Sequence, residues 1–220
     1  MTRPHIPELL DAAGAPPQEV ARALAGLRRY NRWLGGRRVL VGMVEREVRR
    51  LGLAAFSLLD VGAGSGDLPA AAARRFPSAR LVVSDLKPHH LVRNGLPCLA
   101  AAAEALPFRG RSFDFVAASL LLHQFRDPEV VRLLEAFGRL ARRAVLVSEL
   151  ERHWFPLWFV RLTAPALAPS PLARHDGAAS VRQAFRPGEL KELACRAGFA
   201  RVEVRRHRPW FRLSLVASHE

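Results

Sequence analysis

A glycine-rich segment at 58–67, LLDVGAGSGD, carries residue types that are well suited to binding a ligand. Three glycines, Gly62, Gly64 and Gly66, follow a short apolar run and precede a stretch with helical spacing. Glycine has no Cβ and tolerates left-handed torsions, so such a loop lets the backbone approach a ligand closely. The helix after the loop offers unpaired N–H groups and the positive end of its dipole. Enzymes that bind nicotinamide dinucleotides use a related loop, so the loop alone leaves the ligand open.

Three details distinguish this segment from the dinucleotide fingerprint. The glycines are spaced GxGxG and not GxGxxG, so the third one comes a residue early. Asp60 stands two residues before the first glycine, where a dinucleotide enzyme needs no negative charge. Asp85 ends the next apolar run, where a carboxylate can accept both hydrogen bonds of a ribose diol. Leu86 beside it can lie against an adenine face.

Four histidines are candidates for a general base, since imidazole can take up a proton near neutral pH. His123 follows an apolar run, and His175 adjoins Asp176, whose carboxylate could orient its ring. His153 precedes an aromatic stretch, and His207 lies near the last turn. A structural or solvent-exposed role is the alternative for each of them, and we name His175 and His123 as catalytic candidates. No cluster of His, Cys, Asp and Glu has the spacing of a metal site, so we expect no metal.

Alternating strands and helices must position these side chains. Successive βα units of the observed length favour a parallel sheet with right-handed crossovers. Pro16 and Pro17 suit the start of a first helix, and Gly35 and Gly36 suit its end. Further helices are predicted at about 37–51, 68–76, 86–93, 129–140 and 187–197, and strands at 56–61, 80–84, 97–101, 113–118, 144–148, 200–207 and 210–217.

Residues 151–187 break this pattern. Trp154, Phe155, Trp158 and Phe159 are mixed with five prolines, and the stretch is too short and too interrupted for a membrane span. We expect an insertion or lid over the carboxyl edge of the sheet. Its aromatic side chains would pack together or wall an apolar substrate pocket.

The bulk composition narrows the class of protein. A chain of 220 residues with 50% hydrophobic residues is long enough for one well-packed domain and short for two. The first fifteen residues lack the apolar run of a signal peptide, so we expect a cytoplasmic protein. Cys98 and Cys195 stand far apart in apolar contexts and predict reduced, buried thiols. The net charge of +14 invites a nucleic-acid partner, but the arginine doublets are dispersed and not interleaved with aromatics, which disfavours one.

From about Leu58 to Ser148 the chain resembles the class I S-adenosylmethionine (SAM)-dependent methyltransferases, in particular the group that includes the ubiquinone and menaquinone methyltransferases. The resemblance includes AEALPF at 103–108, followed by SFD at 112–114. It implies a Rossmann-like α/β fold, with a seven-stranded, mostly parallel sheet and helices on both faces. One domain would then comprise N-terminal helices at 1–52, a SAM-binding core at 53–149, a lid at 150–187, and a C-terminal helix and strands at 188–220.

The resemblance also implies roles for particular residues. The three loop glycines would pass under the methionine and ribose portions of SAM, with Asp60 near the amino group and Asp85 on the ribose hydroxyls. Ala102 departs from the family, which often has an acid there on the adenine amino group, so adenine recognition would rest on main-chain groups. Ala103 and Glu104 would edge the adenine, and Ser119 would approach the methionine end. The predicted cofactor-binding residues are Asp60, Gly62, Ala63, Gly64, Gly66, Asp85, Leu86, Ala103, Glu104 and Ser119.

Two charged residues have alternative roles. Asp67 could touch the ligand, but a helix N-cap is the favoured interpretation. Arg32 could meet the SAM carboxylate or an acidic substrate, and a surface arginine is the favoured interpretation. Arg32 lies in one of several short stretches that are similar to a bacterial subgroup of small-molecule methyltransferases of secondary metabolism: 31–36, 175–177, 180–182 and 184–185.

We therefore expect SAM-dependent methylation of a small, largely apolar acceptor. The favoured reaction is O-methylation of a phenol, quinol or polyketide-type hydroxyl with a histidine base, ahead of C-methylation. An RNA or protein methyltransferase, suggested by the charge, and a non-catalytic binding protein with the same fold are the alternatives. The sequence leaves a homodimer open.

Overall fold

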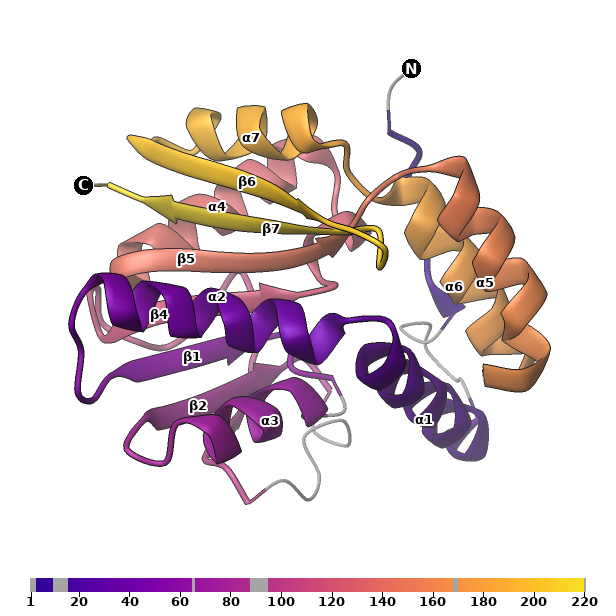
Figure 1. Ribbon diagram of the computed structural model, residues 1–220, viewed down its shortest axis with the longest axis horizontal. Helices are drawn as coiled ribbons and strands as arrows, with labels where there is room; N and C mark the ends of the chain where they lie inside the picture. Colours follow the sequence, from indigo (N-terminus) through magenta and orange to yellow (C-terminus); the bar gives the residue numbers. More distant parts are fainter. Residues whose placement is uncertain (1–2, 10–15, 65, 88–94, 168–169, 220) are drawn as a thin grey trace.

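A seven-stranded sheet with the order β3-β2-β1-β4-β5-β7-β6 forms the centre of the molecule (Figure 1). The computed structural model describes residues 3–9, 16–64, 66–87, 95–167 and 170–219. Neighbouring strands from β3 to β5 pair in parallel, and β7 pairs antiparallel with both β5 and β6. The strands are β1 (Ser57–Val61), β2 (Arg80–Asp85), β3 (Cys98–Ala100), β4 (Phe113–Ser119), β5 (Ala141–Leu150), β6 (Arg201–His207) and β7 (Arg212–Ser218).

Helices cover both faces of this sheet because its central strands are apolar on both sides. Phe115 and Ala117 of β4 pack with α2 and α3 on one face, while Val116 and Ala118 pack with α4 and α7 on the other. This alternation follows from the two-residue period of a strand. These four helices are α2 (Gly36–Arg50), α3 (Asp67–Arg75), α4 (Asp127–Leu140) and α7 (Pro187–Arg196).

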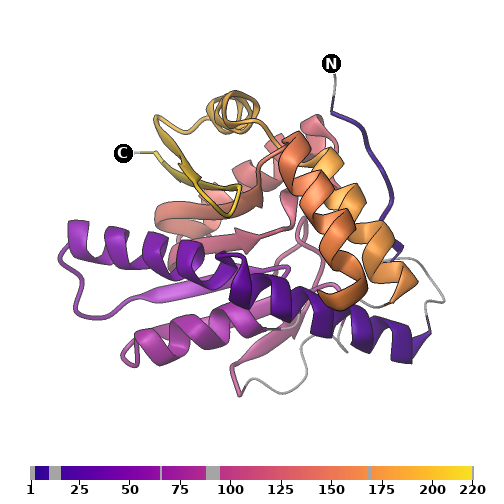
Figure 2. The ribbon, with the colours of Figure 1, turned by 45° about the vertical axis from the view of Figure 1, so that its right-hand side comes forward.

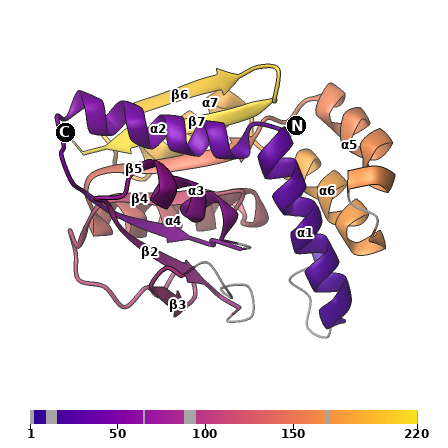
Figure 3. The ribbon, with the colours of Figure 1, turned by 60° about the horizontal axis from the view of Figure 1, so that its bottom comes forward.

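Three further helices lie beyond the carboxyl ends of the parallel strands, where Figures 1, 2 and 3 show them as a separate group. They are α1 (Pro17–Trp33), α5 (Trp154–Leu167) and α6 (Pro171–Gln183), and they contact one another. Pro156 lies in the first turn of α5, and Pro171 is the first residue of α6, both positions that tolerate proline. The segment predicted as a lid thus forms two helices next to the sheet edge at which ligands bind in folds of this kind.

The N-terminal segment 3–9 runs along this helix group. The guanidinium of Arg3 donates to the carbonyl oxygens of His123 and Gln183 at 2.9 and 2.8 Å, and pairs with Asp127 at 3.0 Å. It also lies over the ring of Phe185, 4.4 Å from the centroid. These contacts hold the segment beside the carboxyl ends of β4 and β5.

The predicted order of the strands is confirmed. The start of one strand, one predicted helix and the predicted burial of the cysteines need correction. The fifth strand begins at Ala141 instead of 144, because Ala141 pairs with Phe113 of β4. Leu86 and Lys87 form a bend where a helix at 86–93 was expected, and the rest of that helix, 88–94, lies outside the described residues. The prediction of buried thiols is wrong, since Cys98 starts the edge strand β3 and Cys195 lies on the solvent side of α7, so both are exposed. No helix in the described ranges combines the length and apolar character that crossing a membrane requires.

Candidate active site

The glycine loop after β1 has the left-handed backbone that its sequence indicates. Gly62, Gly64 and Gly66 have φ values of 68°, 52° and 67°. The N–H of Ala63 donates to the carbonyl of Ser84 at 3.0 Å, which ties the loop to the end of β2. A Cβ on Gly64 would meet no atom of the described residues within 4 Å, so the backbone there faces open space. The loop therefore exposes its main chain at the carboxyl end of β1.

A cavity of about 210 Å³ lies against this loop. Every predicted cofactor-binding residue lines it except Gly66. Leu24, Leu27 and Asn31 of α1 also line it, as does Asp67. No signal in the sequence indicated the three residues of α1, because their helix is remote along the chain from the glycine loop. The nine predicted residues at this cavity are Asp60, Gly62, Ala63, Gly64, Asp85, Leu86, Ala103, Glu104 and Ser119.

Carboxylates give this cavity its chemical character. Asp60 is 1% exposed, and its Oδ1 has no hydrogen-bond partner within the described part of the chain. Burial, and then the charges of Asp67 and Asp85, raise the pKa of Asp60 to about 8. A cationic group in the cavity would relieve both effects and give Oδ1 a partner. The site therefore suits a ligand with an ammonium group or another positive charge.

Asp85 is held in place by the loop that it faces. Its Oδ2 accepts the N–H of Gly64 at 2.8 Å, and its Oδ1 accepts the N–H of Lys87 at 3.0 Å. An ionised carboxylate has about four lone-pair sites, so it can still accept from hydroxyls. The position at the end of β2 is the one from which a ribose diol can be bound.

The structure corrects one assignment and confirms another. Asp67 is not the N-cap of α3, because Gly66 takes that position; Asp67 is the first helical residue. Its carboxylate accepts from Asn31 Nδ2 at 3.4 Å and from Arg37 Nε at 3.3 Å. Arg32 is exposed and lies over the ring of Trp33. It lines neither this cavity nor the larger cavity described next, as expected of a surface arginine.

A second, larger cavity of about 490 Å³ adjoins the first. Leu27, Leu120 and Gln124 line both, so these three residues form a boundary that the two cavities share. Most of its walls are apolar and come from α1, α5, α6 and the turn before β7. Phe155 of α5 packs on Phe211 of that turn with 5.1 Å between ring centroids. The aromatic residues of the lid thus wall a pocket large enough for a small molecule.

His123 is the predicted base that reaches this second cavity. It lies in the short 3-10 helix η3 (Leu122–Gln124), 2% exposed. Its Nδ1 lies 2.7 Å from Oε2 of Glu149, and its Nε2 lies 3.2 Å from Oε1 of Glu8. Burial alone would lower the pKa of His123, but the charges and hydrogen bonds of Glu149 and Glu8 outweigh it and raise the pKa to about 10. Both ring nitrogens then donate, and the ring is an imidazolium.

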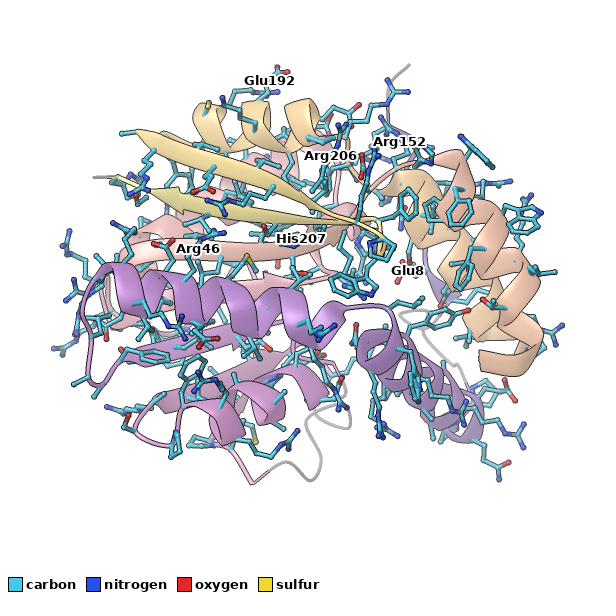
Figure 4. All side chains as sticks on the ribbon, viewed as in Figure 1. Glu8, Arg46, Arg152, Glu192, Arg206 and His207 are labelled. Carbon is cyan, nitrogen blue, oxygen red and sulfur yellow. The ribbon has the colours of Figure 1, made fainter. Side chains whose placement is uncertain are left out.

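Glu8 enters the cavity from the N-terminal segment, and Figure 4 shows it between α6 and the sheet. Its carboxylate accepts from Gln124 Nε2 at 3.0 Å, from Gln183 Nε2 at 3.3 Å and from the hydroxyl of Ser180. Burial would raise the pKa of Glu8, but its hydrogen bond to His123 and the charge of that ring hold it below the ordinary value. Sequence reasoning missed Glu8 because a single glutamate in the polar N-terminal segment belongs to no motif.

The other three candidate histidines line neither cavity. His175 is half-exposed, with Nδ1 3.1 Å from Oδ1 of Asp176, so the carboxylate does contact the ring as expected. Its role as a base stays a prediction. His153 stacks on Phe211, and His207 bonds Ser214 Oγ at 2.7 Å.

Arg212, the first residue of β7, is a functional candidate that the sequence reading did not identify. Its side chain lines the larger cavity and is 2% exposed. Nε donates to the carbonyl of Leu34 at 2.9 Å and Nη2 to Oδ1 of Asn31 at 3.0 Å, while Nη1 has no partner among the described residues. Burial lowers the pKa of Arg212 to about 10, against the raising effect of Glu149 and Asp67. The signal available in the sequence was a charged residue at the start of a strand that is otherwise made of apolar and small residues.

Comparison with known proteins agrees with this arrangement. Residues 58–144 match the family described as "Methyltransferase domain". A curated malonyl-[acyl-carrier protein] O-methyltransferase of Dechloromonas aromatica (strain RCB) is 30% identical over 172 residues, which cover 73% of the chain and 60% of that protein. The chain thus spans about three fifths of the length of this relative.

Solved structures show the same fold at low sequence identity. The plantazolicin methyltransferase in complex with S-adenosylhomocysteine is 12% identical, with a TM-score of 0.67, covering 92% of the chain and 96% of that protein. Human N-acetylserotonin methyltransferase in complex with SAM is 17% identical, with a TM-score of 0.63, covering 96% of the chain and 62% of that protein. The predicted seven-stranded, Rossmann-like class I arrangement is confirmed.

Proposed function

Because the chain carries a methyltransferase domain with the Rossmann-like class I fold, we propose that it transfers the methyl group of SAM to an oxygen of a small, largely apolar acceptor. The observation that carries this proposal is the pairing of two adjoining cavities. One is lined by a glycine loop and carboxylates, and the other has aromatic and aliphatic walls. A donor and an acceptor can therefore meet at the residues that line both.

The smaller cavity is the proposed SAM site. The unpartnered Oδ1 of Asp60 would take the amino group, and the open space at Gly64 would let the ligand pass close to the main chain. Asp85 would accept the ribose hydroxyls, Ala103 and Glu104 would edge the adenine, and Ser119 would lie near the methionine end. When bound, SAM supplies an activated methyl group: the acceptor oxygen forms the C–O bond, the C–S bond breaks, and its electron pair leaves on sulfur as S-adenosylhomocysteine.

The larger cavity is the proposed acceptor site. Its aromatic walls would exclude water and hold an apolar body in one orientation, and proximity and alignment can supply several kcal/mol of the barrier reduction. The name of the curated relative states O-methylation of a malonyl group on acyl carrier protein, and O-methylation is the reaction we propose here.

An acceptor hydroxyl of phenol, quinol or polyketide type needs a base, and His123 is placed for it at the cavity wall. His123 would first have to lose a proton, because Glu149 and Glu8 hold it protonated. Movement of the Glu8 carboxylate away from the ring would remove one of the two charges that hold this proton, so that Nε2 could release it to solvent and then accept. His175, which lines neither cavity, is the second candidate and would need a movement of α6 to reach an acceptor.

The distribution of charge argues against RNA as the acceptor. The charged or titratable residues that line the acceptor cavity are Glu8, Tyr30, His123, Asp176 and Arg212. Arginines gather instead at the opposite, amino edge of the parallel strands, around Arg139, Arg142 and Arg201. A nucleic-acid backbone would be drawn to that edge and away from the proposed site.

The first test is calorimetry with SAM on wild type, on Asp85→Asn and on the surface control Glu135→Gln. We expect SAM to bind wild type and the control equally, and Asp85→Asn to bind at least about tenfold more weakly, since a charge-assisted hydrogen bond is worth about 1.5–3 kcal/mol. Release of S-adenosylhomocysteine with a panel of small acceptors then tests transfer. Binding of a nicotinamide dinucleotide in place of SAM would reject the proposal.

A further inference from the structure

Four hydrogen-bond donors converge on one carboxylate inside the acceptor cavity. The Nε2 atoms of His123, Gln124 and Gln183 lie 3.2, 3.0 and 3.3 Å from the oxygens of Glu8, and the Ser180 hydroxyl also donates to it. The donors come from η3 and α6, which carry the cavity wall, whereas the carboxylate comes from the N-terminal segment. The wall itself is thus built to hold a carboxylate group.

Arg212, a second and independent feature of the cavity, also favours an anionic ligand. Arg212 is buried and lines the cavity, and its Nη1 has no hydrogen-bond partner among the described residues. Its other nitrogens donate to neutral oxygens of Leu34 and Asn31, and no carboxylate of the described residues forms an ion pair with the guanidinium, although the charges of Glu149 and Asp67 act on it from farther away. A buried guanidinium with an unpaired N–H is costly unless a ligand supplies an acceptor, and an anion is the best one.

We propose that the acceptor is a small apolar carboxylic acid, whose carboxylate takes the place of the Glu8 carboxylate among these donors and becomes a methyl ester. The proposal rests on the methyl transfer proposed above and names its acceptor class. The apolar body of the acid would lie against Phe155 and Phe211, and Arg212 would add positive charge to the pocket.

Methylation of a carboxylate is compatible with a protonated His123. A carboxylic acid with an ordinary pKa of about 4 is ionised near neutral pH and needs no base. One of its oxygens provides the electron pair of the new C–O bond, the C–S bond of SAM breaks, and no proton leaves the acceptor. His123 then acts as a positioning residue, because an imidazolium donates to a carboxylate and cannot remove a proton.

The test compares an acid, an amide and an alcohol of one skeleton, which differ only in the reacting group, with a phenol of similar size. Hydrocinnamic acid, hydrocinnamamide, hydrocinnamyl alcohol and para-ethylphenol are titrated into wild type saturated with S-adenosylhomocysteine, and are then assayed for methyl products with SAM. We expect the acid to bind at least about tenfold more tightly than the amide or the alcohol, as charge-assisted bonds predict. We also expect the methyl ester as product, at a rate that changes little between about pH 6 and pH 8 when SAM is saturating, because the acid is ionised throughout.

The contribution of Arg212 is tested with Arg212→Met and Arg212→Lys, each against Arg201→Met, an exposed arginine at the opposite edge of the sheet. Folding is checked first by thermal unfolding. We expect Arg212→Met to lose about tenfold of its affinity for the acid with unchanged affinity for SAM, the lysine variant to recover part of it, and the control to match wild type. A loss confined to SAM would show that Arg212 holds the methionine carboxylate of SAM, and would remove it from the proposal.

The outcomes separate this inference from the proposed function. Equal binding of acid and alcohol, or methylation of para-ethylphenol with a rate that rises with pH and no ester from the acid, would overturn the carboxylate proposal and leave methyl transfer standing. SAM binding with no methyl product from any acceptor, combined with tight binding of the acid, would reject the proposed function while the carboxylate site remained.

Discussion

His123 and Glu149 form a buried pair in which Nδ1 lies 2.7 Å from Oε2. The other carboxylate oxygen of Glu149 accepts the N–H of Leu122 at 2.8 Å, so the pair joins the end of β5 to the segment after β4. Glu149 and Leu122 are both fully buried, which keeps water from competing for these bonds. Glu149, at the end of β5, is therefore the larger of the two acidic influences that keep His123 protonated, ahead of Glu8.

Replacing Glu149 with glutamine should lower the pKa of His123 from about 10 by more than one unit, because its largest favourable charge is lost while burial remains. NMR titration of the imidazole resonances measures this directly. The variant should also be less stable, by about 3–5 kcal/mol, as expected when one partner of a buried pair is removed. If His123 titrates in Glu149→Gln as it does in the surface control Glu135→Gln, then Glu8 alone raises the pKa of the ring.

The pH dependence of stability should carry the signature of His123. Its pKa is raised from the ordinary 6.5 to about 10 on folding, so its contribution to the unfolding free energy is complete below about pH 6.5 and is lost as the pH rises through 10. Urea unfolding of wild type should therefore show stability falling across this window. His123→Gln should show a flatter profile, and parallel profiles for the two proteins would contradict the assignment.

Binding of SAM should release a proton from Asp60. The carboxyl is largely protonated near neutral pH, since burial and its acidic neighbours raise its pKa to about 8, and a cationic ligand would lower that pKa. SAM affinity should consequently increase from about pH 6 to pH 8. Calorimetry in buffers of different ionisation enthalpy counts the proton, and Asp60→Asn should abolish its release. Equal heats in all buffers for wild type would reject this account.

Removing the Glu8 carboxylate should strengthen acceptor binding if an acid takes its place. Glu8→Ala should lower the dissociation constant of hydrocinnamic acid by roughly tenfold, because the Nε2 donors of His123, Gln124 and Gln183 lose the carboxylate that accepts from them. Glu8→Gln keeps a neutral occupant and should lie between the two. Weaker binding of the acid to Glu8→Ala would indicate that Glu8 helps to hold the acceptor instead.

Gly35 should tolerate no side chain. Its φ is 75°, and a Cβ would lie 2.5 Å from the indole of Trp210, a residue that walls the acceptor cavity. Gly52 makes a matched control, with a φ of 63° and no atom of the described residues within 4 Å of a Cβ. Gly52→Ala should lose only the backbone cost of about 1–2 kcal/mol in urea unfolding. Gly35→Ala should lose more and should also weaken acceptor binding.

Much of the proposed SAM site could be predicted from the sequence because it is built from contiguous motifs. Each part of the site lies at or just after the carboxyl end of a strand. These parts are the glycine loop, the carboxylates of Asp60 and Asp85, and residues 103–104. Parallel strands bring their carboxyl ends to one edge, so local patterns were enough to assemble them. The strand and helix order followed from apolar periodicity for the same reason.

Only part of the acceptor site, His123 and the aromatic residues of the lid, could be predicted in this way. Glu8, His123, Glu149 and Arg212 are spread over nearly the whole chain, and none of them belongs to a motif. Only tertiary packing brings the N-terminal segment against η3 and α6, places Glu149 on His123 and closes Arg212 from solvent. Burial then sets the charge of each group, because the cost of removing a charge from water depends on neighbours that sequence order does not reveal. The sequence by itself determined the fold and the likeness to SAM-dependent enzymes, and the tertiary structure decided the chemistry of the acceptor pocket.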